Sequence, residues 1–226
     1  MALILPFGLK TPRVGRDVFL APNATLIGDV EIGPQASIWF GAVLRGDIGR
    51  IRVGPRTNVQ DLACIHLTEG LSEAILGADV TVGHSAIIHG AIIGDRCLIG
   101  MGSIVMDNAQ VGEGSLVAAG SVVTPRTVIP PGSLVRGAPA RVIRPVTPEE
   151  AVLGIEGARH YLATARVYRG MVADLPQVAP AEQVGSFQPS RSLRESAWRE
   201  GERDAVPGRE RERALDMGND RDGGED

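Results

Sequence analysis

The chain has 226 residues, of which 43% are hydrophobic, and its formal net charge at pH 7 is -4. This charge argues against a nucleic-acid-binding protein, which needs a clustered basic face. Two cysteines cannot build a disulfide framework, no apolar run is long enough to span a membrane, and the N-terminus lacks the charged region of a signal peptide. We therefore predict a soluble cytoplasmic protein with neither nucleic-acid nor membrane partners.

Aliphatic residues recur every six positions along most of the chain. After two insertions, between Leu44 and Val53 and between Ile65 and Leu76, and one step of five positions from Ile88 to Ile93, the spacing runs without error to Val135. A period of six fits neither an α-helix nor a continuous strand. It fits short strands separated by corners, and a β-sandwich would show such spacing only by coincidence. Because stacked coils bury one continuous aliphatic column, residues 1-145 are predicted to form an all-β solenoid, the hexapeptide form of parallel β-helix.

The longer interruption lies between Ile65 and Leu76, which are eleven positions apart instead of six. The five extra residues are assigned to a loop near Gly70 to Ala74. This loop interrupts the repeat in the segment that carries three of the four histidines of the chain.

A C-terminal helix is predicted within residues 146-174. Thr147 can cap its start, Pro148 suits the first helical position, and Glu150 completes a capping box. The helix is expected to run from about Pro148 to Arg169, and two glycines, Gly154 and Gly157, weaken its first half.

The second half of this helix places Tyr161, Ala165 and Tyr168 on one face, which predicts docking by that face. The helix would cover the solenoid, as capping elements of repeat proteins do. Residues 175-226 lose the periodicity and are rich in Arg, Asp, Glu, Gly and Ser. Such a composition predicts a disordered charged tail.

Two histidines are spaced for adjacent coils. His66 and His89 each follow an inward-facing isoleucine, and they are 23 residues apart. Removing the five loop residues leaves one full coil, so both should lie on the same face at roughly 4.8 Å from each other. Two imidazoles placed in this way can share one metal ion.

The third histidine, His84, cannot easily join them. It lies five residues before His89, which corresponds to roughly 16 Å of extended chain. An ion bound at about 2.0 to 2.1 Å from each nitrogen cannot accept both from one chain. We therefore predict that His84 comes from a neighbouring subunit, in a homotrimer with its sites at the interfaces.

The two cysteines and the fourth histidine are the remaining residues that could bind a metal. Cys64 is either a fourth ligand, through its spacing to His66, or a small residue near a corner. Cys97 is expected in the core, and His160 on the surface of the helix.

The chain resembles the γ-class carbonic anhydrases from about Pro6 to Gly170. The matching motifs are Arg45-Gly46-Asp47, Asn58-Val59-Gln60-Asp61, His66, Gly83-His84 and His89-Gly90. The resemblance implies a left-handed β-helix with a C-terminal helix, assembled as a homotrimer. It also implies that zinc, or iron or cobalt, is bound by His66, His84 and His89 across the subunit interface.

The resemblance implies reversible hydration of CO2 to bicarbonate by a carbonate dehydratase-type lyase. Three neutral imidazoles leave an open position for water. The ion lowers the pKa of that water to about 7, a value for which carbonic anhydrase is itself the standard example. By this resemblance, the hydroxide formed in this way would attack CO2.

The resemblance also assigns roles to the neighbouring residues. Gln60 is expected to orient the hydroxide or the substrate, and Tyr161 to face the site. Arg45 and Asp61 resemble a pair that links subunits, and Asp47 is expected to support that network. For these three charged residues, a purely structural interface network and direct catalysis both remain open.

Two departures from the family pattern predict slow hydration. The archetypal member has a glutamate after its Arg-x-Asp segment, where this chain has Ile48. The archetype also carries a long acidic loop with a proton-shuttling glutamate. The short loop of this chain offers only Glu69 and Glu73, so proton export is expected to limit the reaction.

Three other functions fit the same solenoid. A hexapeptide-repeat acyltransferase shares the trimeric prism and a Gly-x-Pro-Ala segment, here Gly137 to Ala140, but commonly uses a single histidine as base. A metal-dependent thioesterase would act on CoA esters. The third alternative is a non-catalytic, metal-stabilised trimeric scaffold whose tail recruits a partner.

Overall fold

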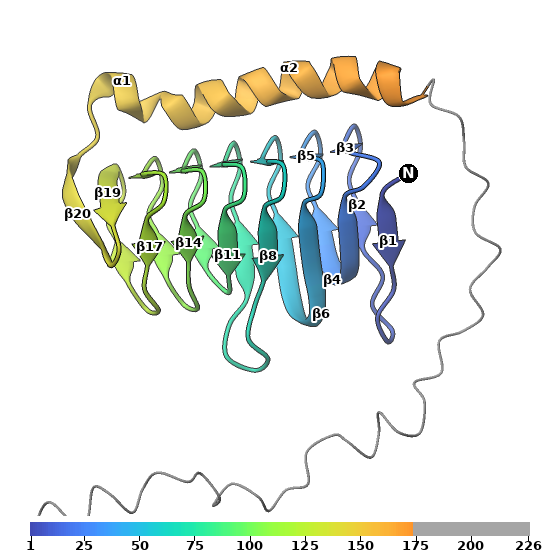
Figure 1. Cartoon of the computed structure of the whole chain (residues 1–226), viewed down its shortest axis with the longest axis horizontal. Coiled ribbons are helices and arrows are strands. Elements are labelled where there is room, and N and C mark those ends of the chain that lie inside the picture. Colours follow the sequence, from blue (N-terminus) through green and yellow to red (C-terminus); the bar gives the residue numbers. More distant parts are fainter. Residues whose placement is uncertain (174–226) are drawn as a thin grey trace, which may run out of the picture. The chain divides into compact units, whose positions relative to one another are not determined.

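In the computed structural model, which describes residues 1–173, the chain is a left-handed parallel β-helix closed by a C-terminal helix (Figure 1). This confirms the fold predicted from the six-residue period. The predicted tail, residues 175-226, lies outside the described residues. Among residues 1–173, no helix has the length and apolarity needed to cross a membrane.

Three faces build each coil of the solenoid. The first and second faces belong to one twelve-stranded sheet, and the third face is an eight-stranded sheet. The strands of the first face are β1 (Leu3–Leu5), β8 (Cys64–His66), β11 (Ile87–His89), β14 (Ile104–Val105) and β17 (Val122–Val123). Those of the second face are β2 (Arg13–Val14), β9 (Ala74–Leu76), β12 (Ile92–Ile93), β15 (Gln110–Val111) and β18 (Val128–Ile129). Two long strands, β4 (Thr25–Ile32) and β6 (Val43–Val53), turn the corner between these faces and join them.

The third face is the one on which the helix packs. Its strands are β3 (Phe19–Leu20), β5 (Ser37–Ile38), β7 (Asn58–Val59), β10 (Thr81–Val82), β13 (Leu98–Ile99), β16 (Leu116–Val117), β19 (Ser133–Gly137) and β20 (Ala140–Pro145). All its pairs are parallel except β19 with β20, a hairpin that ends the stack.

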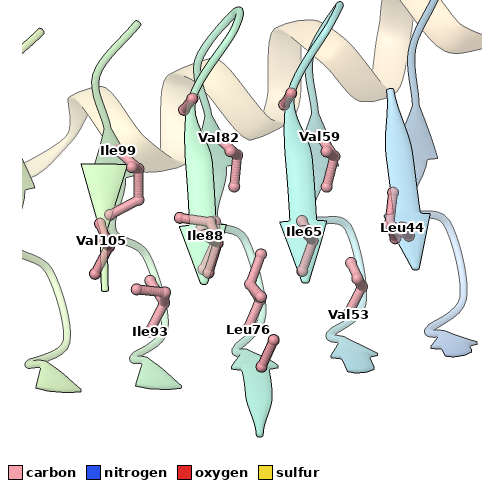
Figure 2. Packing of buried hydrophobic residues seen from close by; sticks show 14 of the residues in the cluster. Leu44, Val53, Val59, Ile65, Leu76, Val82, Ile88, Ile93, Ile99 and Val105 are labelled. Atoms are coloured by element: carbon pink, nitrogen blue, oxygen red, sulfur yellow. The ribbon is translucent and has the colours of Figure 1, made fainter. Parts of the chain in front are cut away.

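The aliphatic column predicted from the repeat fills the inside of the solenoid. Every sixth residue from Ile93 to Val135 is at most 2% exposed. Figure 2 shows such residues from successive coils pointing into the same interior. Burial of this column provides the main driving force for folding, at about 25 cal/mol for each Å² of apolar surface removed from water.

The two insertions into the repeat lie at the corner between the first and second faces. In β6, the segment from Gly46 to Arg50 bulges out, so that the register with β4 shifts. In the next coil the loop occupies residues 67–73, immediately after His66. The predicted position, Gly70 to Ala74, was wrong at its end, because Ala74 is buried inside β9. The loop begins earlier because buried Leu67 folds back against Gly49 of the bulge.

The predicted start of the helix is confirmed. Glu150 N donates to Thr147 Oγ1 at 3.2 Å, and Thr147 N donates to Glu150 Oε2 at 2.8 Å, which together form a capping box. The helix is divided at Val152 into α1 (Pro148–Ala151) and α2 (Leu153–Ala173), and it ends four residues beyond the predicted Arg169.

The predicted docking face of α2 is confirmed as well. The helix runs along the third face and contacts β3, β5, β7, β10 and β13 (Figure 1). The ring of Trp39 meets those of Tyr161 and Tyr168 edge-on at 4.9 Å and 5.3 Å, and Ala165 is buried. Farther along, Arg169 Nη2 donates to the carbonyl oxygen of Asp17 at 3.0 Å.

The two glycines of α2 have a role beyond weakening it. A Cβ added to Gly154 would collide with the backbone of Arg96, and one added to Gly157 would lie 2.7 Å from Thr81 Oγ1. Glycine at these positions lets the helix approach the third face closely, which propensity alone could not predict.

We expect Gly157→Ala to destabilise the fold by about 1–3 kcal/mol, because the added methyl group must displace Thr81. Gly170→Ala is the matched control, since nothing lies within 4 Å of the added Cβ in the same helix. It should raise the free energy of unfolding by about 0.5–1 kcal/mol. Denaturant unfolding measures both, and equal effects of the two substitutions would contradict the close approach.

Candidate metal centre

The structure brings two of the three predicted metal ligands together. His66 at the end of β8 pairs with His89 at the end of β11, in register across adjacent coils. Their ring centres are 5.5 Å apart, and the rings are inclined at 82°. An ion bound tetrahedrally at about 2.1 Å from one nitrogen of each ring would hold the ring centres about 5 Å apart. The separation of the two ring centres is therefore compatible with a shared ion.

Each of these histidines is fixed by its Nδ1 atom. His66 Nδ1 lies 2.7 Å from the carbonyl oxygen of Arg45, and His89 Nδ1 lies 3.0 Å from Asp107 Oδ2. A carbonyl or a carboxylate oxygen can only accept, so both Nδ1 atoms donate. This leaves the Nε2 lone pair of each ring for a ligand, an arrangement typical of metal-binding histidines.

Asp107 stays ionised beside His89. Burial raises its pKa, but hydrogen bonds from Ser72 and His89 outweigh that effect and bring the pKa below the usual value. A charged carboxylate holds the imidazole more firmly than a neutral acceptor would.

Two predicted charged residues lie beside His66. Arg45 Nη1 donates to Asp47 Oδ2 at 2.7 Å, and the other oxygen of Asp47 is 3.8 Å from His66 Nδ1. We call His66, His89, Arg45, Asp47 and Asp107 the first half-site.

Cys64 is the first residue of β8 and follows the turn at Leu62 by two positions, so it lies near a corner, as one of the two alternatives predicted. Because Ile65 between them points inward, Cys64 and His66 share the outer side of β8. Burial raises the pKa of the Cys64 thiol, which disfavours the thiolate needed by a metal ligand. The other two predictions hold, since Cys97 is fully buried and His160 is exposed.

The third predicted ligand, His84, lies at the corner before β11. Its Nδ1 donates to Asp61 Oδ2 at 2.8 Å, and the coils stack there because Ser85 N donates to the carbonyl oxygen of Asp61 at 2.9 Å. The hydroxyl of Tyr161 is 3.4 Å from His84 Nε2. Burial and, secondly, the Asp61 carboxylate raise the pKa of Tyr161, so its hydroxyl keeps its proton.

Gln60 belongs with His84. It is 6% exposed, and its Nε2 donates to Asn58 Oδ1 at 3.1 Å. Asn58 in turn donates to Thr81 Oγ1 at 2.9 Å, which fixes the Gln60 amide. We call His84, Asp61, Tyr161 and Gln60 the second half-site.

The two half-sites are separate within one chain. Among residues 1–173, no three histidine, cysteine or acidic residues are grouped closely enough to hold a metal ion. In the same part of the chain Arg45 pairs with Asp47, and Asp61 pairs with His84. The pairing of Arg45 with Asp61, like the three-histidine site, remains a prediction that requires a second subunit.

An apolar groove of about 300 Å³ adjoins the second half-site. His84 and Gln60 supply its polar wall, and the rest is mostly apolar, from Leu98, Ile99, Met101, Leu116, Ala118 and Ala119. A larger cavity of about 470 Å³ lies beyond the loop on the second face. Ile48, Arg50 and Glu73 line that cavity, and Glu73 lies 3.8 Å from Arg50.

Sequence reasoning missed Asp107 of the first half-site and two residues that contact half-site members, Ser72 and Trp39. Asp107 lies eighteen residues after His89, which is one coil, so the repeat itself could have revealed it. Ser72 lies in the loop and Trp39 beneath Tyr161. Neither carries a spacing signal, because the loop is outside the repeat and Trp39 meets Tyr161 and Tyr168 only through the docked helix.

The chain matches the family described as "Bacterial transferase hexapeptide (six repeats)" over residues 11–46 and 90–125. The gap between these matches contains the bulge, the loop and all three histidines of the half-sites. The regular coils are thus shared with a wide group of proteins, and the site lies where the coils are irregular.

Known proteins resemble this chain over most of its described part. It is 41% identical over 169 residues to a carbonic anhydrase of Geobacillus kaustophilus, covering 75% of this chain and 92% of that one. It is 49% identical over 164 residues to the mitochondrial gamma carbonic anhydrase 3 of Arabidopsis thaliana, covering 70% and 64% of the two chains. The chain spans about three fifths of the length of the mitochondrial relatives.

A solved structure with the same fold is that of a Bacillus cereus protein described as a putative acetyltransferase. It is 40% identical, its TM-score is 0.73, and the match covers 75% of this chain and 98% of that one. The identities to the carbonic anhydrases, over most of the bacterial relative's length, decide the family. Together with the solenoid and its two half-sites, they show that this chain belongs to the γ-class carbonic anhydrase family.

Proposed function

We propose that the protein catalyses the reversible hydration of CO2 at a metal ion held between subunits of a homotrimer. The observation that carries this proposal is the pair His66 and His89, 5.5 Å apart with both Nδ1 atoms fixed. Zinc is the proposed metal, because three neutral imidazoles in tetrahedral geometry suit it, with iron or cobalt as alternatives.

The homotrimer follows from the separation of the half-sites. Each chain carries one half-site on its first face and a different one at a corner, so neighbouring subunits meet through unlike surfaces. Such a heterologous interface closes into a ring when the rotation is threefold. His84 of each subunit would then complete the first half-site of the next, and Arg45 would meet the neighbour's Asp61.

When bound, the ion supplies a Lewis acid that makes a coordinated water acidic near neutral pH. The residues of this chain do the rest. Gln60, with its amide fixed by Asn58, orients the substrate from the second half-site. The Tyr161 hydroxyl lies at His84 Nε2 and faces the same position. Arg45, Asp47 and Asp61 hold the two half-sites against each other.

Slow proton export is proposed to limit the rate. Ile48 and Glu73 both line the cavity beyond the loop, and Glu73 lies 3.8 Å from Arg50. Because Ile48 stands where the archetypal member has a glutamate, no acidic side chain at this position can carry a proton to solvent.

The test combines metal analysis, mass measurement and stopped-flow CO2 hydration on the purified full chain. We expect one metal ion per subunit in a trimer, slow hydration, and loss of hydration after chelation. Metal-free trimers with acetyl-CoA affinity would refute the proposal. A metal-loaded trimer active on neither CO2 nor CoA esters would favour the scaffold. The cytoplasmic location remains a prediction from the sequence.

A second candidate function is the hydrolysis of CoA esters, and the apolar groove favours it. Its volume of about 300 Å³ far exceeds that of CO2, and pockets of this size bury small ligands. An acyl chain in the groove would bring its thioester to His84 and Gln60.

Ala119→Trp separates the two functions, because Ala119 is an exposed residue of the groove wall and the indole would fill the groove. If acyl chains bind there, hydrolysis of a medium-chain acyl-CoA should fall at least about tenfold, the effect of losing about 1.4 kcal/mol of binding. Hydration of CO2 should stay unchanged. Equal losses of both activities, or no loss of either, would contradict this assignment of the groove.

A further inference from the structure

The loop of residues 67–73 is fastened to the solenoid close to a proposed metal ligand. Ser72 Oγ donates to Asp107 Oδ1 at 2.5 Å, although the two residues are 35 positions apart. Ser72 Oγ also accepts from the backbone N–H of Thr68 at 3.2 Å. The hydroxyl thus joins the two ends of the loop to each other and to the next coil.

The other oxygen of the same carboxylate holds His89. Asp107 Oδ2 accepts from His89 Nδ1 at 3.0 Å, and the Asp107 side chain is only 15% exposed. A continuous chain of hydrogen bonds therefore runs from the loop backbone through Ser72 and Asp107 to the imidazole. We call this chain of contacts the loop latch.

The residue after His89 leaves room for the latch. Gly90 has φ +62°, and a Cβ added there would lie 2.6 Å from the Cβ of Ser72 and collide with both Ser72 Oγ and Asp107 Oδ1. The Ser72 hydroxyl and the Asp107 carboxylate thus meet in the space that a side chain at position 90 would occupy. This gives Gly90 a role that its turn conformation alone does not explain.

The loop latch distinguishes His89 from the other two predicted ligands, His66 and His84. His66 is held by a backbone carbonyl of β6, and His84 by Asp61 one coil away. Only His89 is held by a carboxylate that itself depends on the loop, as far as residues 1–173 show.

We infer that Ser72 and Asp107 are positioning residues, which through the loop latch hold the His89 ring so that its Nε2 faces the metal. This inference rests on the proposed function in one respect, that His89 is a metal ligand. The short loop then has a task of its own, which is to orient a ligand from outside the repeat.

The experiment measures Co²⁺ and Zn²⁺ affinity of the full-length trimer by competition with a chromophoric chelator. Asp107→Asn should weaken binding about 10–100-fold, the usual effect of losing the partner of a metal-bound histidine. Ser72→Ala should weaken it in the same direction but less. In the Asp107→Asn background, Ser72→Ala should have no further effect, because the pair acts as one unit.

Ser133→Ala is the matched control, because its hydroxyl donates only to a backbone oxygen, that of Pro130 at 2.7 Å. It should leave metal affinity unchanged, although it also removes a serine hydroxyl that donates a hydrogen bond. Thermal unfolding of each variant separates loss of the fold from loss of positioning. Unchanged affinity in Ser72→Ala, or additive effects of the two substitutions, would overturn the inference.

A metal-free readout separates this inference from the proposed function. The ¹⁵N shifts of the His89 ring report which nitrogen carries the proton. The wild-type chain should show the proton on Nδ1, and both variants should shift the population toward Nε2. If the wild type binds no metal but the two variants show this shift, the proposed function fails and the positioning stands. Variants whose His89 ring keeps the wild-type proton position would refute the positioning.

Discussion

Replacing His66 with alanine is expected to abolish CO2 hydration and metal binding together. The substitution leaves His89 as the only imidazole of the first half-site, so an ion would lose one of its three protein ligands. Losing the partner of a ligand already costs about 10–100-fold in metal affinity or activity, and losing the ligand itself should cost more than that. Stopped-flow hydration and metal content of the purified trimer measure the two effects.

His160→Ala is the control for this experiment. His160 is exposed on α2 and belongs to neither half-site, although its ring lies 5.8 Å from that of Tyr161. Its replacement should leave hydration and metal content at the wild-type level. A His66→Ala protein that still hydrates CO2 at the wild-type rate would show that the measured activity does not come from this site.

Two inactive variants are expected to restore activity when their subunits are mixed. His66→Ala spoils the first half-site and His84→Ala the second. In a trimer refolded from equal amounts of both, an interface is intact when each side contributes its undamaged half-site. Random assembly makes about one quarter of the interfaces intact, so about one quarter of wild-type activity should return.

Mixing His66→Ala with His89→Ala is the matched control, because both substitutions spoil the same half-site. No interface can then be complete, and no activity should return. The same failure in the first mixture, with mixed trimers confirmed by mass spectrometry, would mean that all three histidines act within one chain. That outcome would contradict the interface site and the reason for the trimer.

The repeat allowed more of this molecule to be predicted than sequence usually does. Each coil imposes the same condition, which is an aliphatic side chain pointing inward at every sixth position. A wrong assignment at one position therefore does not change the predicted fold. The pairing of His66 with His89 followed from counting coils, and the register of β8 and β11 confirms it.

The features that could not be predicted lie where a residue must satisfy both its local pattern and a contact with another part of the fold. The loop begins before its predicted position because Leu67 packs against Gly49 of the neighbouring coil. Gly154 and Gly157 were predicted only to weaken the helix. In the docked helix, a side chain at either position would collide with the solenoid. Contacts between loops and between layers depend on tertiary packing, which no local pattern encodes.

The docked helix also bears on how this fold can change its length during evolution. Gly154 lies against Arg96 beside β13, and Arg169 is bonded to Asp17 beside β3. The helix rises about 22 Å between these contacts, which is close to the roughly 19 Å of the four coil spacings that it covers. Duplicating a coil within this stretch would demand about three more helical residues at the same time. A coil added between β13 and β20 would lengthen the path from Pro145 at the end of β20 back to Gly154, so the same condition extends to the last coils.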